Sequence, residues 1–252
     1  MNLNDRTALV TGASRGIGRA IAQRLAAAGA RVAVHYRQNR TAAELTFQAL
    51  SGQGHILIQA DLTKPDEVQR MVETAIEQLG GLDILVNNAG ITAEHQPLAD
   101  IDYRTWQDSW QQVIHTNLIG AANASYCAAR HMIERKSGKI INIGSRGGYR
   151  GEPLSPAYGA SKAGLHALSQ SLAKYLGQYG VFVTAVAPGF VQTDMARTSL
   201  AGSQGDEIRN QSPFGRVATP EEVAHTVLFL AAPGSEWHTG GVLDLNGASY
   251  LR

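Results

Sequence analysis

The sequence of 252 residues contains a single cysteine, Cys127, so the chain cannot form an internal disulfide bond. A free thiol is typical of proteins in a reducing compartment and argues against a secreted domain held by disulfides. The surrounding stretch Asn117–His131 has a helical pattern. That pattern favours Cys127 as a small packed side chain over Cys127 as a catalytic nucleophile.

Long apolar runs are also missing. No run approaches the roughly 18 consecutive apolar residues of a membrane span. The first residues, MNLNDRTALV, have no basic region followed by an apolar stretch, so no secretory signal is predicted. From these absences we expect a cytoplasmic protein.

Charge of neither sign predominates, because 22 Lys and Arg residues stand against 21 Asp and Glu residues. Nucleic acids and anionic membranes select clustered positive charge, so neither is predicted as a partner. None of the 8 histidines pairs with another His, a Cys or an acid at a metal-ligand spacing on a helix. We therefore expect no catalytic metal.

Short apolar runs recur along the whole chain and are typical of parallel strands covered on both faces. These runs are Thr7–Thr11, Val32–Tyr36, His55–Gln59, Ile84–Asn87, Lys139–Ile143, Val181–Val186 and Val242–Asp244. Helical patterns lie between them, including Gly18–Ala28, Pro65–Leu79, Ala157–Leu176 and Val223–Ala232. The alternation predicts an α/β fold: a Rossmann-type, doubly wound sheet of about seven mostly parallel strands with helices on both faces.

We expect residues 1–252 to form a single domain, since no linker of biased composition divides the chain. The long stretch Phe190–Phe214 has no clear period. A segment of that length inside a compact domain is usually functional. We expect residues 190–214 to cover the substrate.

A glycine-rich turn, Thr11–Gly18, follows the first predicted strand and opens a helix. Glycine lets the backbone turn sharply and approach a pyrophosphate at the positive end of the helix. A plain turn is the alternative, but the position directly after the first strand favours a dinucleotide site. Its expected residues are Gly12, Ser14, Arg15, Gly16, Ile17 and Gly18.

The end of the second strand, Val34–Arg37, indicates which dinucleotide binds. A site that prefers NAD usually has a carboxylate here, which accepts a hydrogen bond from the ribose 2′-hydroxyl. This strand ends without one, and Arg37 together with Arg15 could instead clamp the 2′-phosphate of NADP. The alternative is that both arginines are solvated, and the sequence favours NADP.

Tyr158 and Lys162 lie four residues apart in a predicted helix, so they share one face. A phenol normally titrates near pH ~10, and a neighbouring ammonium lowers that pKa. A lowered pKa would suit proton exchange at neutral pH. Such pairs are common on ordinary helices, so the meaning of this one depends on the other motifs.

Taken together, the motifs resemble the short-chain dehydrogenase/reductase family over essentially the full length of the chain. They are, in order, Thr11–Gly18, Asp61, Asn87–Gly90, Asn117, Ser145, Tyr158 with Lys162, and Pro188-Gly189 with Thr193. The resemblance implies that Tyr158 is the general acid/base and that Ser145 hydrogen-bonds the reacting carbonyl oxygen. It also implies that Lys162 binds the nicotinamide ribose and tunes Tyr158, and that Asn117 holds a water in a proton relay.

The same resemblance assigns the rest of the cofactor site. Asp61 and Leu62 would meet the adenine, and Asn88, Ala89 and Gly90 would lie beneath the adenosine ribose. The nicotinamide would contact Pro188, Gly189, Val191 and Thr193.

Within the family, Ala187–Met195 and Asn246-Gly247 resemble bacterial 3-oxoacyl-[acyl-carrier-protein] reductases. Those reductases carry arginines on the carrier-docking surface where this chain has Lys136 and Tyr179. Reduction of a 3-oxoacyl thioester therefore stays one option.

In the loops near the substrate we expect Arg146 to be exposed, with recognition of an anionic substrate as the alternative. We expect His95 to lie on the surface, with a place in the pocket as its alternative.

The predicted function is NADP(H)-dependent hydride transfer to or from a carbonyl or secondary alcohol. The main alternative is a non-catalytic NADP-binding regulatory protein, which would be expected to lose Tyr158 or Lys162. A sugar-nucleotide epimerase would need a longer chain.

Family members pair the helix Ala157–Leu176 across a two-fold axis, so we expect a homotetramer, with a dimer second.

Overall fold

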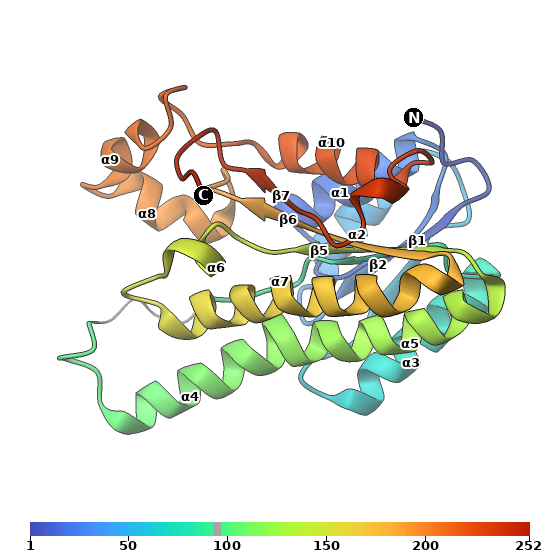
Figure 1. Ribbon diagram of the computed structural model, residues 1–252, viewed down its shortest axis with the longest axis horizontal. Helices are drawn as coiled ribbons and strands as arrows, with labels where there is room; N and C mark the ends of the chain where they lie inside the picture. Colours follow the sequence, from blue (N-terminus) through green and yellow to red (C-terminus); the bar gives the residue numbers. More distant parts are fainter. Residues whose placement is uncertain (93–96) are drawn as a thin grey trace.

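The computed structural model describes residues 1–92 and 97–252. At its centre is a seven-stranded sheet in the order β3-β2-β1-β4-β5-β6-β7 (Figure 1). All neighbouring strands pair in parallel. The strands are β1 Thr7–Val10, β2 Arg31–Tyr36, β3 Ile56–Gln59, β4 Ile84–Asn87, β5 Gly138–Ile143, β6 Val181–Pro188 and β7 Val242–Leu245. This arrangement confirms the predicted fold class.

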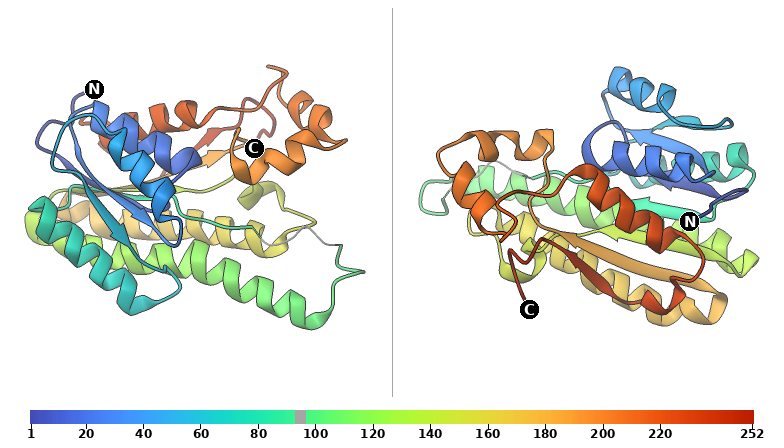
Figure 2. Two further views of the ribbon diagram at one scale, coloured as in Figure 1. Left: turned by 180° about the vertical axis from the view of Figure 1, so that it is seen from behind. Right: turned by 90° about the horizontal axis from the view of Figure 1, so that it is seen from above.

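Helices cover both faces of the sheet, as Figure 2 shows from behind and from above. One face is covered by α1 Gly16–Ala27, α2 Arg40–Gln48 and α10 Pro220–Ala231. The other is covered by α3 Pro65–Leu79, α5 Gly120–Arg135 and α7 Pro156–Leu176. In the described part of the chain, no helix is both long and apolar enough to cross a membrane.

The strands have nearly continuous apolar runs because both of their faces are buried. In β1, Ala8 and Val10 face the cluster under α1 and α10, whereas Leu9 faces the cluster under α3 and α5. A strand in this position needs apolar residues at successive positions rather than at alternate ones. The layered core therefore follows from the runs that the sequence displays.

Local signals set the ends of the longer helices. Pro is the first residue of α3, α7 and α10, where its missing N–H costs no helical hydrogen bond. At α10, Thr219 and Glu222 form a reciprocal capping box. At the other end of α3, Gly80 adopts the left-handed conformation with φ 72°, which stops the helix.

Helix α4, Tyr103–Ile114, runs on into α5 through a π-helical turn at His115–Ile119. A π turn inserted in an α-helix often marks a functional position. Shorter helical pieces are α6 Gly147–Arg150, η2 Gly177–Tyr179, η3 Asp194–Ala196, α8 Arg197–Ala201, α9 Gly205–Asn210 and η4 Glu236–His238. Three of these pieces lie in the stretch 190–214, which is why no single period appears there.

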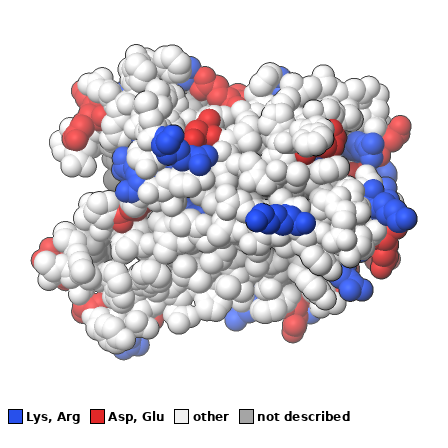
Figure 3. All heavy atoms as spheres, in the orientation of Figure 1, with Lys and Arg blue, Asp and Glu red and all other residues white. Residues whose placement is uncertain are grey.

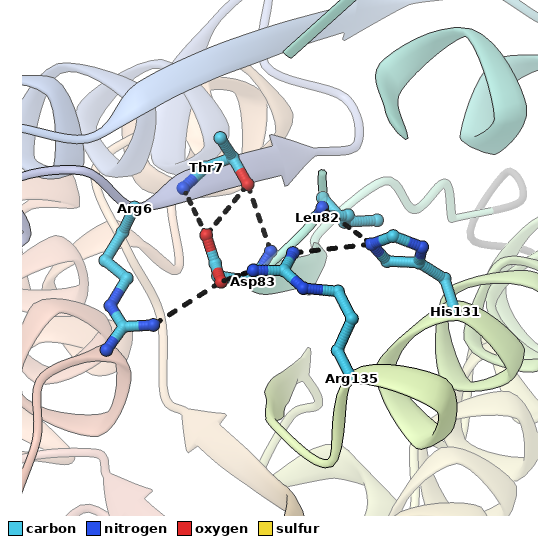
Figure 4. Close-up of polar contacts among 6 residues, drawn as sticks. All are labelled: Arg6, Thr7, Leu82, Asp83, His131 and Arg135. Atoms are coloured by element: carbon cyan, nitrogen blue, oxygen red, sulfur yellow. Dashed lines mark hydrogen bonds and ion pairs between the residues drawn. The ribbon is translucent and has the colours of Figure 1, made fainter. Parts of the chain in front are cut away.

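The amino edge of the sheet is held by a cluster around Asp83 (Figure 4). Asp83 Oδ2 accepts hydrogen bonds from Thr7 N at 2.9 Å and Thr7 Oγ1 at 3.0 Å. Its other oxygen lies 3.4 Å from Arg6 and 3.2 Å from Arg135 at the end of α5. The cluster ties β1, β4 and α5 together and leaves the carboxyl edge of the sheet free for a site.

Candidate active site

A cleft of about 540 Å³ opens at the carboxyl edge of the sheet. Parallel strands all end at this edge, so the loops that follow them converge here. The lining includes every predicted site residue apart from Asn117, namely Gly12, Ser14, Arg15, Gly16, Ile17, Gly18, Arg37, Asp61, Leu62, Asn88, Ala89, Gly90, Ser145, Tyr158, Lys162, Pro188, Gly189, Val191 and Thr193.

The glycine turn forms one end of this cleft, and it packs directly against the end of β4. A Cβ on Gly18 would lie 2.3 Å from Gly12 O, and a Cβ on Gly12 would lie 2.8 Å from Ala89 Cα. The amide of Asn88 donates to Thr11 O at 2.8 Å and to Gly12 O at 3.1 Å, which holds the turn in place. No side chain can replace these glycines without moving the backbone.

The amino end of α1 is open to an anion. Its first turn carries no acidic residue, and no side chain caps it. The first N–H groups of a helix lack helical partners and carry partial positive charge. Together with the close backbone packing of the glycines, this donor set fits a pyrophosphate.

The other end of the cleft holds Ser145, Tyr158 and Lys162. Ser145 follows β5, and its hydroxyl is hydrogen-bonded to that of Tyr158 in the first turn of α7. Lys162 is 4% exposed, and its Nζ lies 5.6 Å from the centre of the Tyr158 ring. The ammonium donates to Ile143 O at 2.8 Å. The hydroxyls of Ser145 and Tyr158, which are partly buried, therefore lie near one buried cation.

Asn117 lies behind the cleft, in the π-helical turn between α4 and α5. Its Oδ1 accepts from Ile91 N at 2.8 Å, and its Nδ2 donates to Ile91 O at 2.9 Å and Ser161 Oγ at 3.1 Å. A Cβ on Gly90 would lie 3.4 Å from both Asn117 Oδ1 and Lys162 Nζ. Asn117 thus anchors the chain after β4 close to the ammonium.

Comparison with known proteins identifies the family. Residues 6–204 match the short chain dehydrogenase family. The chain is also 39% identical over 249 residues to the 3-oxoacyl-[acyl-carrier-protein] reductase FabG of Staphylococcus epidermidis strain RP62A, with 98% of this chain and 100% of that protein covered. This chain is a short-chain dehydrogenase/reductase. The resemblance drawn from the motifs is confirmed.

Further relatives of this dehydrogenase/reductase agree. A 3-oxoacyl-[acyl-carrier-protein] reductase of Synechocystis is 40% identical over 252 residues, covering 99% of this chain and 98% of that one. A solved dehydrogenase/reductase of Sinorhizobium meliloti has a TM-score of 0.88 at 35% identity, covering 99% and 97%. A solved putative gluconate dehydrogenase of Agrobacterium tumefaciens has a TM-score of 0.90 at 32% identity, covering 100% and 98%. The chain is therefore an oxidoreductase of a family that uses nicotinamide cofactors.

In this dehydrogenase/reductase the two arginines expected at the adenosine ribose have carboxylate partners. Arg37 Nε lies 3.0 Å from Asp61 Oδ2, and Arg15 Nη1 lies 3.9 Å from Asp194 Oδ2. Burial by itself would raise the pKa of Asp61, but hydrogen bonds from Thr63 and the charge of Arg37 together lower it. Both arginine side chains stay largely accessible, Arg37 at 50% and Arg15 at 67% exposed.

Burial governs the ionisation of Tyr158 and Lys162. Burial raises the pKa of Tyr158, the hydrogen bond with Ser145 opposes this, and the charge of Glu152 adds to it. The net direction is opposite to the one expected from the neighbouring lysine, because loss of hydration outweighs the other influences. Burial also lowers the pKa of Lys162 to about 8. Glu152, in the loop that follows Ser145, lines the cleft.

The expectation of an exposed Arg146 is wrong. Its side chain is 3% exposed and donates hydrogen bonds to Gln211 and Ser249, which come from two later segments of the chain. His95 lies outside the described residues. Within the described residues, no group of three His, Cys, Asp or Glu side chains could hold a metal ion.

His35, in β2, supports the glycine turn, and the sequence reasoning missed it. The ring is 1% exposed, its Nδ1 accepts from Gly12 N at 3.0 Å, and its Nε2 lies 3.0 Å from Ala60 O. Burial lowers the pKa of His35 to about 4, so at neutral pH Nε2–H donates to Ala60. A polar residue inside the apolar run of the second strand was the signal that could have revealed it.

We predict that His35 makes the fold sensitive to acid. Between its ordinary pKa of 6.5 and its folded pKa of about 4, the unfolded chain binds a proton that the folded ring does not. Stability therefore falls as pH falls through this window. From pH 7 to 5 the natural protein should lose about 2 kcal/mol more unfolding free energy than His35→Gln, measured by urea denaturation.

His115→Gln, which removes an exposed ring, is the matched control and should keep the full loss. Equal losses in the natural protein and in His35→Gln would show that the buried ring takes up its proton as readily as the unfolded chain does.

Proposed function

We propose that this protein transfers a hydride between NADP(H) and a carbonyl or secondary alcohol substrate, with Tyr158 as general acid/base. The hydrogen-bonded pair Ser145 and Tyr158 carries the proposal, because it lies at the end of a cleft whose other end suits a pyrophosphate. The presence of both Tyr158 and Lys162 disfavours the alternative of a non-catalytic NADP-binding regulator.

The cleft residues fit such a cofactor along its whole length. The glycine turn would hold the pyrophosphate, Asp61 and Leu62 the adenine, and Asn88–Gly90 the adenosine ribose. Tyr158 and Lys162 would bind the nicotinamide ribose, with the nicotinamide itself against Pro188, Gly189, Val191 and Thr193. When bound, the nicotinamide supplies or accepts the hydride.

The chain's own residues would manage the proton. In the reductive direction, Ser145 Oγ and Tyr158 Oη both donate to the carbonyl oxygen as negative charge develops on it. Tyr158 then transfers its proton to that oxygen. A raised pKa keeps the phenol protonated until the oxygen becomes basic enough to take the proton. Lys162 holds positive charge near the ring, which favours the phenolate that remains.

Asn117 would serve the expected proton relay indirectly. Its side chain is committed to Ile91 and Ser161, so a relay water would bind to the main chain of the π-helical turn. The side chain would keep that turn beside Lys162.

Replacing Tyr158 with Phe removes one hydroxyl from the lining of the cleft. Turnover should fall about 10²- to 10⁴-fold, because the positioned acid is lost. Binding of NADPH, measured by fluorescence titration, should remain within threefold of the natural protein. Tyr126→Phe, on an exposed ring of α5, is the control and should keep full turnover. Near-normal turnover of Tyr158→Phe on a good substrate would refute the assigned role.

NADP is proposed over NAD because Arg15 and Arg37 border the adenosine end of the cleft. Each would exchange a carboxylate partner for the 2′-phosphate, which reduces the gain from charge-assisted bonds of roughly 1.5–3 kcal/mol each. We expect kcat/KM to favour NADPH over NADH by roughly 10- to 1000-fold. The preference should shrink at high salt, because both arginines are partly exposed.

Arg37→Ala tests this assignment directly. The variant should lose about tenfold or more in kcat/KM with NADPH and change little with NADH. Arg40→Ala, which breaks an exposed pair with Glu44 nearby, should leave both values unchanged. Equal efficiency with both cofactors in the natural protein would remove the basis for NADP.

A second substrate class, 3-oxoacyl thioesters, is supported by the 39–40% identity to two acyl-carrier-protein reductases. Tyr179 supplies no charge to a carrier, which weighs against that class. On the face drawn in Figure 3, acidic and basic groups are interspersed and no broad basic patch appears. An NADPH-oxidation panel of 3-oxoacyl thioesters, ketones and oxidised polyhydroxy acids would separate these substrates.

We further propose one cytoplasmic domain in which residues 190–214 cover the substrate. Phe190, Met195 and Ser199 line the cleft, so this segment already borders the place where a substrate would lie next to Ser145.

The proposed assembly is a homotetramer. Leu165 and Leu176 of α7 are buried against the sheet, so they do not provide the interface. Exposed tyrosines remain on α4, α5 and α7, namely Tyr103, Tyr126 and Tyr175. Light scattering at micromolar concentration should give four times the chain mass of 26.9 kDa. A species of 26.9 kDa would exclude both the tetramer and the dimer.

A further inference from the structure

Three segments that are distant in sequence meet beside Ser145. They are the loop after β5 (residues 144–152), the covering segment (residues 190–214) and the end of the chain after β7, which we call the strap (residues 246–252). In Figure 1 the end of the chain lies near α6 and α8, which belong to the other two segments. Their contacts centre on Arg146, the residue after Ser145.

Arg146 touches all three segments. Its Nη1 donates to Ser249 O at 3.3 Å and also to Ser249 Oγ in the strap. Its Nη2 donates to Gln211 Oε1 in the covering segment. The guanidinium also lies 5.4 Å from the centre of the Phe190 ring. The main-chain N–H of Arg146 donates to Pro188 O at 2.9 Å, which fixes the loop to the end of β6.

The strap reaches the same loop a second time through its last residue. Arg252 lies 4.2 Å from the centre of the Tyr149 ring, and Tyr149 stacks on His166 with ring centres 4.7 Å apart. His166 Nε2 accepts the main-chain N–H of Ser145 at 3.4 Å. Contacts therefore run from the end of the chain to the backbone of Ser145.

The covering segment and the strap also bind each other directly. Ser212 Oγ donates to Gly247 O at 2.6 Å. Gly247 has φ +58°, and a Cβ there would lie 2.7 Å from Ser212 Oγ. The covering segment and the strap are thus in direct contact at Ser212 and Gly247.

The guanidinium of Arg146 is buried and depends on both the strap and the covering segment for its hydrogen bonds. Arg146 is 3% exposed, and its hydrogen-bond partners in the described chain are uncharged oxygens. Burying a charge is tolerated only while its hydrogen bonds are made. Loss of the strap or of the covering segment would leave Arg146, the residue after Ser145, without part of these hydrogen bonds.

We propose that Arg146 is a positioning residue that binds the strap and the covering segment to the loop after β5 and so holds Ser145 Oγ in reach of the reacting oxygen. The inference rests on the proposed function, since Ser145 is assigned there. It adds a role for the last residues of the chain, which contribute through Arg146 and Tyr149 without lining the cleft.

The central experiment compares Arg146→Met with Arg135→Met. Both remove a guanidinium that joins separate elements, but Arg135 binds Asp83 at the opposite edge of the sheet. Arg146→Met should lower kcat about 10- to 100-fold, because small displacements of a reacting group are costly. Its Kd for NADPH should stay within about twofold, and Arg135→Met should keep kcat. Arg146→Lys, which retains the charge with a single donor centre, should fall between Arg146→Met and the natural protein.

A double-mutant cycle tests whether the strap acts through its contact with Arg146. Ser249→Ala alone should lower kcat several-fold, and adding it to Arg146→Met should cause a smaller loss than it causes alone, since the two residues share a contact. Hydrogen–deuterium exchange gives a readout that needs no substrate. Exchange of the amides in residues 144–150 and 246–252 should rise at least about tenfold in Arg146→Met and stay unchanged in Arg135→Met.

The proposal is overturned if Arg146→Met keeps kcat within twofold, if both arginine variants lose kcat equally, or if exchange in residues 144–150 is unchanged. Failure of the proposed function looks different. In that case none of the carbonyl compounds supports NADPH oxidation by the natural protein. The hydrogen–deuterium exchange measurement still decides whether Arg146 holds the loop after β5.

Discussion

The parallel pairing of β1 with β4 is the constraint on which the rest of the site depends. It places the glycine turn that follows β1 against Asn88 and Ala89, which follow β4, at van der Waals distance. That contact aims the amino end of α1 into the cleft. β5 and β6 run in the same direction, so their ends lie at the same edge of the sheet. Ser145 and Pro188 therefore line the same cleft as the glycine turn. Asp83 holds the opposite edge of the same two strands.

Burial then decides the chemistry of the polar groups around the cleft. His35, Lys162 and Arg146 are each nearly inaccessible, and each is held by hydrogen bonds to defined oxygens or N–H groups. Desolvation lowers the pKa values of His35 and Lys162 and raises that of Tyr158. Burial and hydrogen bonds together restrict the orientation of a polar group, and the reaction proposed for this site requires groups held in this way.

Much of the fold could be predicted because local rules and tertiary structure agree here. The apolar runs matched the strands since parallel strands are buried on both faces, and Pro65 marked the first residue of α3. The short helices within residues 190–214 were not predicted, because α8 and α9 are too brief to display a period. Much of the cleft lining followed from the family motifs, whose residues stand at strand ends and in the first turns of α1 and α7. The role of His35 was not predicted, because it depends on hydrogen bonds with Gly12 and Ala60, which are distant in sequence.

By itself, the sequence determined the order of strands and helices, the glycine turn and the pairing of Tyr158 with Lys162 on one helical face. Each of these depends on neighbours within a few positions, where spacing and side-chain type suffice. Only the tertiary structure decided the burial of Arg146, the carboxylate partners of Arg15 and Arg37, and the direction in which the pKa of Tyr158 shifts. Those properties depend on hydration and on contacts between distant segments, such as Arg146 with Ser249. No pattern along the chain records how much water remains around a side chain once the chain has folded.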